Sequence, residues 1–152
     1  MQPFPHTYTV TASLTQDAVH LESPGLSSFE SAAPAEFGGP GNLWSPETLF
    51  AAAVADCFTL SFKAIAAASK FSYTHLTCHV EAILDRQDRV TRFTGLVIKP
   101  VLTIDNGEQK ERAEKLLGKA EATCLITNSL TAEVTFLPEV SISQPLANFS
   151  GN

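Results

Sequence analysis

The sequence predicts an α+β fold, and three observations lead to this class. Stretches of alternating apolar and polar residues, typical of strands, flank a long apolar helix. A second helix and a last strand follow, with no sustained βαβ alternation and no internal repeat. The 152 residues are 44% hydrophobic and 17% charged, a balance typical of a globular protein. We expect one domain over residues 1–143 and a flexible tail over residues 144–152.

The first third of the chain is predicted to form strands and a loop. Residues 6–14 alternate between apolar and polar side chains, which indicates a half-buried strand. Residues 18–21 follow as the second arm of a hairpin, and residues 27–30 are a weaker candidate for a third strand. The two prolines and three glycines within residues 31–42 predict a loop.

A long helix begins next. Ser45 can cap it, Pro46 fits its first turn, and Glu47 complements the positive end of its dipole. From Glu47 to about Ser69 apolar positions cover nearly the whole circumference, and two charged residues interrupt them, which indicates a buried core helix rather than a membrane span. Because one chain has too few strands to cover such a helix, we expect a second subunit to do so.

Two long strands are predicted after this helix. Residues 73–85 alternate again, residues 85–88 form a polar turn, and residues 90–104 form the return strand. Pro100 indicates an edge position or a bulge in the return strand, because proline has no N–H for a central ladder.

A second helix and one more strand complete the chain. The helix spans residues 108–122, a short helical turn follows at 125–130, and the final strand covers 131–142. The second helix is amphipathic, with its apolar residues facing inward: Ala113, Leu116, Leu117 and Ala120.

Charge and cysteine content narrow the function classes. The net charge of −6 and the lack of a basic cluster exclude a nucleic-acid surface. No basic segment followed by an apolar one marks a secretory signal, and three cysteines in such a chain indicate a reducing, cytoplasmic location. No pair of potential ligands has the spacing of a zinc site, so we expect no metal.

The three cysteines are the candidates for chemistry. Cys57 follows Glu47 by ten residues, close to three helical turns, so the two side chains do not touch without a bend. Cys124 is predicted to begin a short helix, a position that lowers the pKa of a thiol. Cys78 lies within a strand and is predicted to be a packing residue. Spacing alone does not separate a redox pair from two buried thiols.

Two segments resemble a known family. Residues 42–58, NLWSPETLFAAAVADCF, are similar to the central-helix signature of the OsmC/Ohr superfamily, in which a Pro-Glu pair opens the helix and a Cys-Phe follows. Residues 119–136, KAEATCLITNSLTAEVTF, are similar to that family's second-cysteine segment. The order of elements also matches from about His6 to Ile142. This resemblance implies an OsmC-like fold, an intertwined homodimer with two long central helices between strands from both chains.

The resemblance also implies an activity in oxidative stress defence. If the roles of the family's cysteines apply to the matching positions, Cys57 is the peroxidatic thiolate that reduces an organic hydroperoxide. Cys124 is then the resolving thiol that forms a disulfide with Cys57. Glu47 takes the place of the family's active-site glutamate. A dithiol reductant, such as a lipoylated protein, restores both thiols, and no cofactor is needed. Aromatic residues of the preceding loop and helix are candidates for an apolar substrate mouth: Phe37, Trp44 and Phe50.

One departure from the family opens alternatives. The family's active-site arginine comes from the N-terminal part of the chain, and this sequence has no Arg before Arg86. Without a cation, Glu47 and Asp56 raise the pKa of Cys57. Several residues are candidate substitutes for the arginine: Arg86, Arg89, Arg92, His6 and His20. A non-catalytic protein that binds a small hydrophobic molecule at the dimer interface is therefore the alternative, and a slow disulfide sensor is a third hypothesis.

Overall fold

A computed structural model describes residues 1–144 of the chain. The chain forms two compact units that divide within helix α1, an N-terminal unit ending at Phe50 and a C-terminal unit beginning at Ala51. Residues 145–152, most of the predicted tail, lie outside the described residues.

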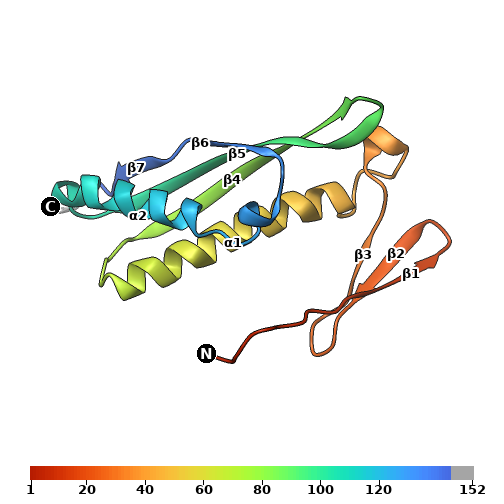
Figure 1. Cartoon of the computed structure of the whole chain (residues 1–152), viewed down its shortest axis with the longest axis horizontal. Helices are drawn as coiled ribbons and strands as arrows, with labels where there is room; N and C mark the ends of the chain where they lie inside the picture. Colours follow the sequence, from red (N-terminus) through yellow and green to blue (C-terminus); the bar gives the residue numbers. More distant parts are fainter. Residues whose placement is uncertain (145–152) are drawn as a thin grey trace, which may run out of the picture. The chain divides into compact units, whose positions relative to one another are not determined.

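The N-terminal unit contains a small antiparallel sheet of order β1-β2-β3 (Figure 1). Its strands are β1 (Thr11–Thr15), β2 (Ala18–Glu22) and β3 (Phe29–Ser31). The hairpin was predicted correctly, but a first strand over residues 6–14 was wrong, because residues 6–10 pair with no strand and β1 starts only at Thr11. The prediction of half-burial was also wrong, since every residue of β1 is exposed.

Large apolar side chains of the N-terminal unit face solvent in the single chain. Leu14 of β1 is 74% exposed, and others share this property: Tyr8, Val10, Leu26 and Phe29. A three-stranded sheet needs an apolar face packed against something for independent stability. Exposed apolar surface of this kind therefore indicates an interaction surface.

Helix α1 (Pro46–Ala68) begins as predicted. The Ser45 Oγ accepts a hydrogen bond from the Thr48 N–H at 3.1 Å, and the Ser45 N–H donates to Thr48 Oγ1 at 2.8 Å, which is a reciprocal N-terminal cap. Only one stripe of the helix is fully buried, at every fourth position: Val54, Phe58, Phe62 and Ala66. The rest of its apolar circumference is partly or fully exposed in this chain. Helix α1 is long and apolar enough to cross a membrane, but the core helix of a globular protein can have the same length and composition.

The C-terminal unit contains a four-stranded sheet with β5 at its centre (Figure 1). Strand β5 (Val90–Ile104) pairs antiparallel with β4 (His75–Gln87) and parallel with both β6 (Glu133–Phe136) and β7 (Glu139–Ile142). Helix α2 (Lys110–Ala122), preceded by the 3₁₀ turn η2 (Gly107–Gln109), connects β5 to its parallel neighbour β6, as parallel pairing requires.

Two predictions about the strand boundaries of this sheet are wrong. The turn of the long hairpin is tighter than predicted, because β4 continues to Gln87 and only Asp88 and Arg89 turn, both at positive φ. The single final strand is two strands, since Leu137 and Pro138 separate β6 from β7.

Pro100 lies in the central strand rather than at an edge or bulge. Strand β6 pairs with β5 only up to Ile98, and β7 pairs with it only from Val101. Pro100 therefore stands where the neighbour of β5 changes, and its missing N–H costs no ladder bond on that side. The irregularity of the β4–β5 pair falls instead between Ile83 and Leu84.

The core of the C-terminal unit joins α1, α2 and the sheet. The predicted inner face of α2 is confirmed, because its four apolar residues are buried: Ala113, Leu116, Leu117 and Ala120. The Phe58 ring of α1 packs against Phe136 of β6 with centroids 5.8 Å apart. The Phe62 ring packs edge-on against Tyr73 at 5.2 Å. These contacts hold the middle of α1, where Cys57 lies, in the C-terminal unit.

Candidate active site

Cys57 and Cys124 come together in the C-terminal unit, although 66 residues separate them in the sequence. Cys57 is half-buried on α1, next to the fully buried Phe58. Cys124 is fully buried in the segment that follows α2. Both thiols are free, and the side chains are hydrogen-bond neighbours. The predicted pair of redox candidates is thus placed side by side by the fold.

Two hydrogen-bond donors also face the Cys57 sulfur. One is the backbone N–H of Ile126, and the other is the hydroxyl of Ser61, one helical turn after Cys57. Each favours the thiolate, because a donor stabilises the charged form of the sulfur that accepts its hydrogen bond.

Burial nevertheless raises the pKa of the Cys57 thiol above its ordinary value. The neighbouring Cys124 side chain raises the pKa further, by its hydrogen bond and by its charge, whereas the Ile126 and Ser61 donors lower it. A raised pKa was predicted, but its physical cause was assigned wrongly. Burial and Cys124 raise it, and the carboxylates of Glu47 and Asp56 are not among the causes.

The segment after α2 holds Cys124 through its backbone. The Cys124 carbonyl accepts hydrogen bonds from the Asn128 N–H and the Thr127 hydroxyl, each at 3.0 Å. The 3₁₀ turn η3 (Thr127–Ser129) has Ile126 as its N-cap, so Cys124 lies two residues before this N-cap rather than at the start of the turn. The backbone N–H of Ile126, at the start of this turn, donates its hydrogen bond to the Cys57 sulfur instead.

Ser61 and Ile126 were missed in the sequence analysis. The sequence does contain a signal for Ser61. It lies four residues after Cys57, and residues four apart on a helix share one face. The amide of Ile126 carries no sequence signal, since any residue except proline supplies a backbone N–H.

We predict that Ser61→Ala raises the pKa of Cys57 further, because it removes a donor that stabilises the thiolate. The measurement is the pH dependence of iodoacetamide alkylation in a background where Cys57 is the only cysteine. Thr59→Ser, on the same helix, is the matched control and leaves the alkylation profile unchanged. A profile unaltered by Ser61→Ala contradicts the assigned hydrogen bond.

Cys78 is the third free thiol of the C-terminal unit. It is half-buried on β4, opposite the fully buried Pro100 of β5. Burial raises the pKa of Cys78 to about 11, and the charge of Cys124 contributes to the increase. Packing on the inner face was predicted for this residue, but its interaction with Cys124 was not.

Glu47, the third predicted catalytic residue, lies in the first turn of α1 within the N-terminal unit. Its Oε2 atom is the one buried side-chain oxygen or nitrogen without a hydrogen-bond partner among residues 1–144. Residues 1–50 contain no Lys or Arg that would pair with it. Leaving a buried carboxylate oxygen without a hydrogen bond costs free energy, so we expect Glu47 to receive a donor from a group other than those of residues 1–144.

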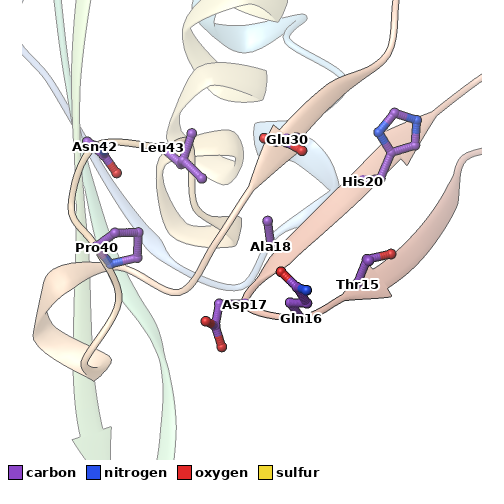
Figure 2. A pocket seen from close by; sticks show the side chains of 9 residues that line it. All are labelled: Thr15, Gln16, Asp17, Ala18, His20, Glu30, Pro40, Asn42 and Leu43. Atoms are coloured by element: carbon purple, nitrogen blue, oxygen red, sulfur yellow. The ribbon is translucent and has the colours of Figure 1, made fainter.

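The aromatic residues predicted to form a substrate mouth lie in the N-terminal unit. Phe37 is 59% and Trp44 is 53% exposed, whereas Phe50 is half-buried. A pocket of about 590 Å³ in this unit is lined by other residues, shown in Figure 2: Thr15, Gln16, Asp17, Ala18, His20, Glu30, Pro40, Asn42 and Leu43. The aromatic substrate mouth therefore stays a prediction.

Within residues 1–144, no group of three or more His, Cys, Asp or Glu side chains is placed to hold a metal ion.

Comparison with known proteins identifies the family. The family model of OsmC-like proteins matches residues 39–138 of the chain. The chain belongs to the OsmC-like family. The match includes α1, Cys57 and the Cys124 segment, and it confirms the α+β class and the resemblance seen in the sequence.

Individual OsmC-like proteins agree with this assignment. An uncharacterized Bacillus subtilis protein, YmaD, is 24% identical over 72% of this chain and 75% of its own length. The crystal structure of an organic hydroperoxide resistance protein OsmC from Legionella pneumophila is 28% identical, with a TM-score of 0.73 over 91% of this chain and 99% of that one. An OsmC-like protein from Vibrio cholerae is 22% identical, with a TM-score of 0.76 over 90% of this chain and 99% of that one. The family thus includes proteins of organic hydroperoxide resistance.

Proposed function

We propose that this OsmC-like protein is a thiol peroxidase that reduces organic hydroperoxides to alcohols. The observation that carries the proposal is the contact between Cys57 and Cys124, with the Ile126 amide and the Ser61 hydroxyl donating to the Cys57 sulfur. The name of the Legionella pneumophila relative, an organic hydroperoxide resistance protein, supports the substrate class.

The reaction proceeds in two steps. The Cys57 thiolate attacks the terminal peroxide oxygen, the O–O bond breaks, and the alkoxide leaves and takes a proton to become the alcohol. Cys57 is then a sulfenic acid. The Cys124 sulfur attacks the Cys57 sulfur, a disulfide forms, and water leaves. The Ile126 and Ser61 donors offset part of the energetic cost of forming the thiolate in a buried position.

A dithiol returns the enzyme to its starting state. Cys124 is fully buried and Cys57 is half-buried, so the reductant attacks the Cys57 sulfur and releases Cys124. The second thiol of the same reductant then displaces Cys57 as that reductant closes its own disulfide. This favours a compact dithiol such as a lipoyl group over a bulky monothiol. We place the reaction in the cytoplasm, where such reductants keep thiols reduced.

A homodimer completes the proposed enzyme. The exposed apolar face of the N-terminal unit and the incompletely buried α1 are surfaces that a second copy of the chain covers. A dimer also offers a source of the donor that the Glu47 Oε2 atom lacks among residues 1–144.

We predict that Leu14→Glu converts the dimer to a monomer at micromolar concentration, because it places a charge on the apolar face of β1. The measurement is the mass by size-exclusion chromatography with light scattering. Ser13→Glu, on the adjacent and oppositely directed position of the same strand, is the control and remains dimeric. A parent protein that is already monomeric refutes the dimer outright.

One observation favours the alternative of a non-catalytic protein that binds a small hydrophobic molecule. The pKa of Cys57 is raised, and residues 1–50 supply no Lys or Arg to lower it. The two functions separate when the purified protein is mixed with cumene hydroperoxide and dihydrolipoamide. Continuous consumption of hydroperoxide supports the peroxidase, whereas consumption at the rate of a protein-free blank supports the binding protein.

A further inference from the structure

The segment between α2 and η3 supplies Cys57 with two of its neighbours. It carries the Cys124 thiol and, two residues later, the Ile126 backbone N–H, which donates a hydrogen bond to the Cys57 sulfur. The path of this short segment therefore decides whether both groups face Cys57.

The end of α2 determines where the Ile126 N–H points. The Cys124 N–H donates to the Glu121 carbonyl at 3.2 Å, three residues earlier, which is the hydrogen bond of a 3₁₀ turn. In a continuing α-helix, the Ile126 N–H would donate to the carbonyl of Ala122, the last residue of α2. Because this N–H donates to Cys57 instead, the Ala122 carbonyl is left for another donor.

The side chain of Asn128 is that donor. Its Nδ2 atom donates to the Ala122 carbonyl at 3.1 Å, six residues back in the sequence. A carboxamide carries the same N–H group as a backbone amide, so it replaces the Ile126 N–H at this carbonyl without loss of a hydrogen bond. The backbone N–H of Asn128 also donates to the Cys124 carbonyl at 3.0 Å. One residue thus ties both the end of α2 and the resolving cysteine to η3.

The other two side chains of η3 make shorter connections. The Thr127 hydroxyl donates to the Cys124 carbonyl at 3.0 Å, and the Ser129 hydroxyl donates to the Leu125 carbonyl at 2.7 Å. Both acceptors lie after α2. Among the three residues of η3, Asn128 is therefore the one whose side-chain hydrogen bond reaches the helix.

We propose that Asn128 is a positioning residue, whose side-chain amide occupies the Ala122 carbonyl and so keeps the Ile126 N–H directed at the Cys57 sulfur. This role deepens, and rests on, the proposed peroxidase function. Without the Asn128 amide, the Ile126 N–H returns to the Ala122 carbonyl and extends α2 by one hydrogen bond. Cys57 then loses a donor that stabilises its thiolate, and the thiolate becomes less populated at neutral pH.

The test compares the parent with Asn128→Leu, which has nearly the size of asparagine but no donor, in a background where Cys57 is the only cysteine. The measurement is the rate of iodoacetamide alkylation as a function of pH. We expect the midpoint of the profile to rise and the rate below the midpoint to fall about three- to tenfold, which is the effect of one hydrogen bond. Asn128→Gln keeps the carboxamide and is expected to lie closer to the parent than to Asn128→Leu.

Ser129→Ala is the matched control. It removes a side-chain donor from the same turn but leaves the hydrogen bond to Ala122 in place, so it keeps the profile of the parent. Asn128 is exposed, and thermal unfolding shows that the variants keep the fold. An unchanged profile in Asn128→Leu, or an equal shift in Ser129→Ala, overturns the role of Asn128.

Alkylation needs no hydroperoxide, so the role of Asn128 and the peroxidase activity are tested separately. Consumption of cumene hydroperoxide by the parent with all its cysteines is measured in parallel, with dihydrolipoamide as reductant. If Asn128→Leu shifts the profile but the parent consumes no hydroperoxide, the peroxidase is overturned and the positioning of the Ile126 N–H stands. If the parent consumes hydroperoxide and Asn128→Leu leaves the profile unchanged, Asn128 is not a positioning residue and the peroxidase stands.

Discussion

Cys57→Ser is expected to abolish hydroperoxide consumption, with a loss of at least about a thousandfold in rate, because a serine hydroxyl in place of the nucleophilic thiolate does not attack the peroxide. Serine has nearly the size of cysteine and fits the half-buried position on α1. The measurement is the decay of cumene hydroperoxide with dihydrolipoamide in excess. Circular dichroism and the thermal unfolding midpoint show whether the variant keeps the fold of the parent.

A matched serine substitution shows that the effect belongs to the sulfur. Ala64 is exposed on the same helix, so Ala64→Ser introduces the same hydroxyl away from the thiol pair and keeps the parent rate. Parent-like consumption by Cys57→Ser would show that another group reduces the hydroperoxide, and the role assigned to Cys57 would be wrong.

Cys124→Ser is expected to stop turnover after the first step. Cys57 still reduces about one equivalent of hydroperoxide, but no thiol is available to close the disulfide, so the sulfenic acid accumulates. Removing Cys124 also removes a neighbour that raises the pKa of Cys57. The single-turnover rate at pH 7 is therefore expected to stay at the parent level or rise, while the steady-state rate with a dithiol falls by at least about tenfold.

Trapping with dimedone measures the accumulated sulfenic acid in Cys124→Ser by the mass of the Cys57 peptide. The same treatment of the parent gives little adduct at early times, because Cys124 closes the disulfide first. If Cys124→Ser turns over at the parent rate and yields no adduct, Cys124 is not the resolving thiol.

The sequence predicted both helices and most of the C-terminal unit, because these elements follow local rules. The cap at Ser45 set the start of α1, and the period of α2 identified the buried face that includes Leu116 and Leu117. The position of Pro100 was mispredicted, because whether a central strand accommodates a proline depends on which strands lie beside it. That pairing is a tertiary property with no local pattern in the sequence.

The N-terminal unit shows where periodicity misleads. The alternation of residues 6–14 predicted a half-buried strand, yet β1 is entirely exposed, because no residues of its own unit cover its apolar face. An alternating pattern indicates that one face is to be buried, but it does not say by which chain.

For the candidate site, the sequence supplied the two cysteines through the family resemblance but not the surroundings that control them. Burial, the contact with Cys124 and the Ile126 amide together set the pKa of Cys57, and these depend on how the segment after α2 packs against α1. The absence of an N-terminal arginine was visible in the sequence. Its structural counterpart, the Glu47 oxygen without a donor, was visible only in the fold.

Disulfide mapping shows whether Cys57 and Cys124 form a redox pair that a hydroperoxide oxidises. The reduced protein receives one equivalent of cumene hydroperoxide, is quenched with an alkylating agent at the earliest accessible time, and is digested for mass spectrometry. We expect a peptide joined through Cys57 and Cys124, formed in the same amount as cumyl alcohol. Full alkylation of both cysteines, with the hydroperoxide unconsumed, would contradict it.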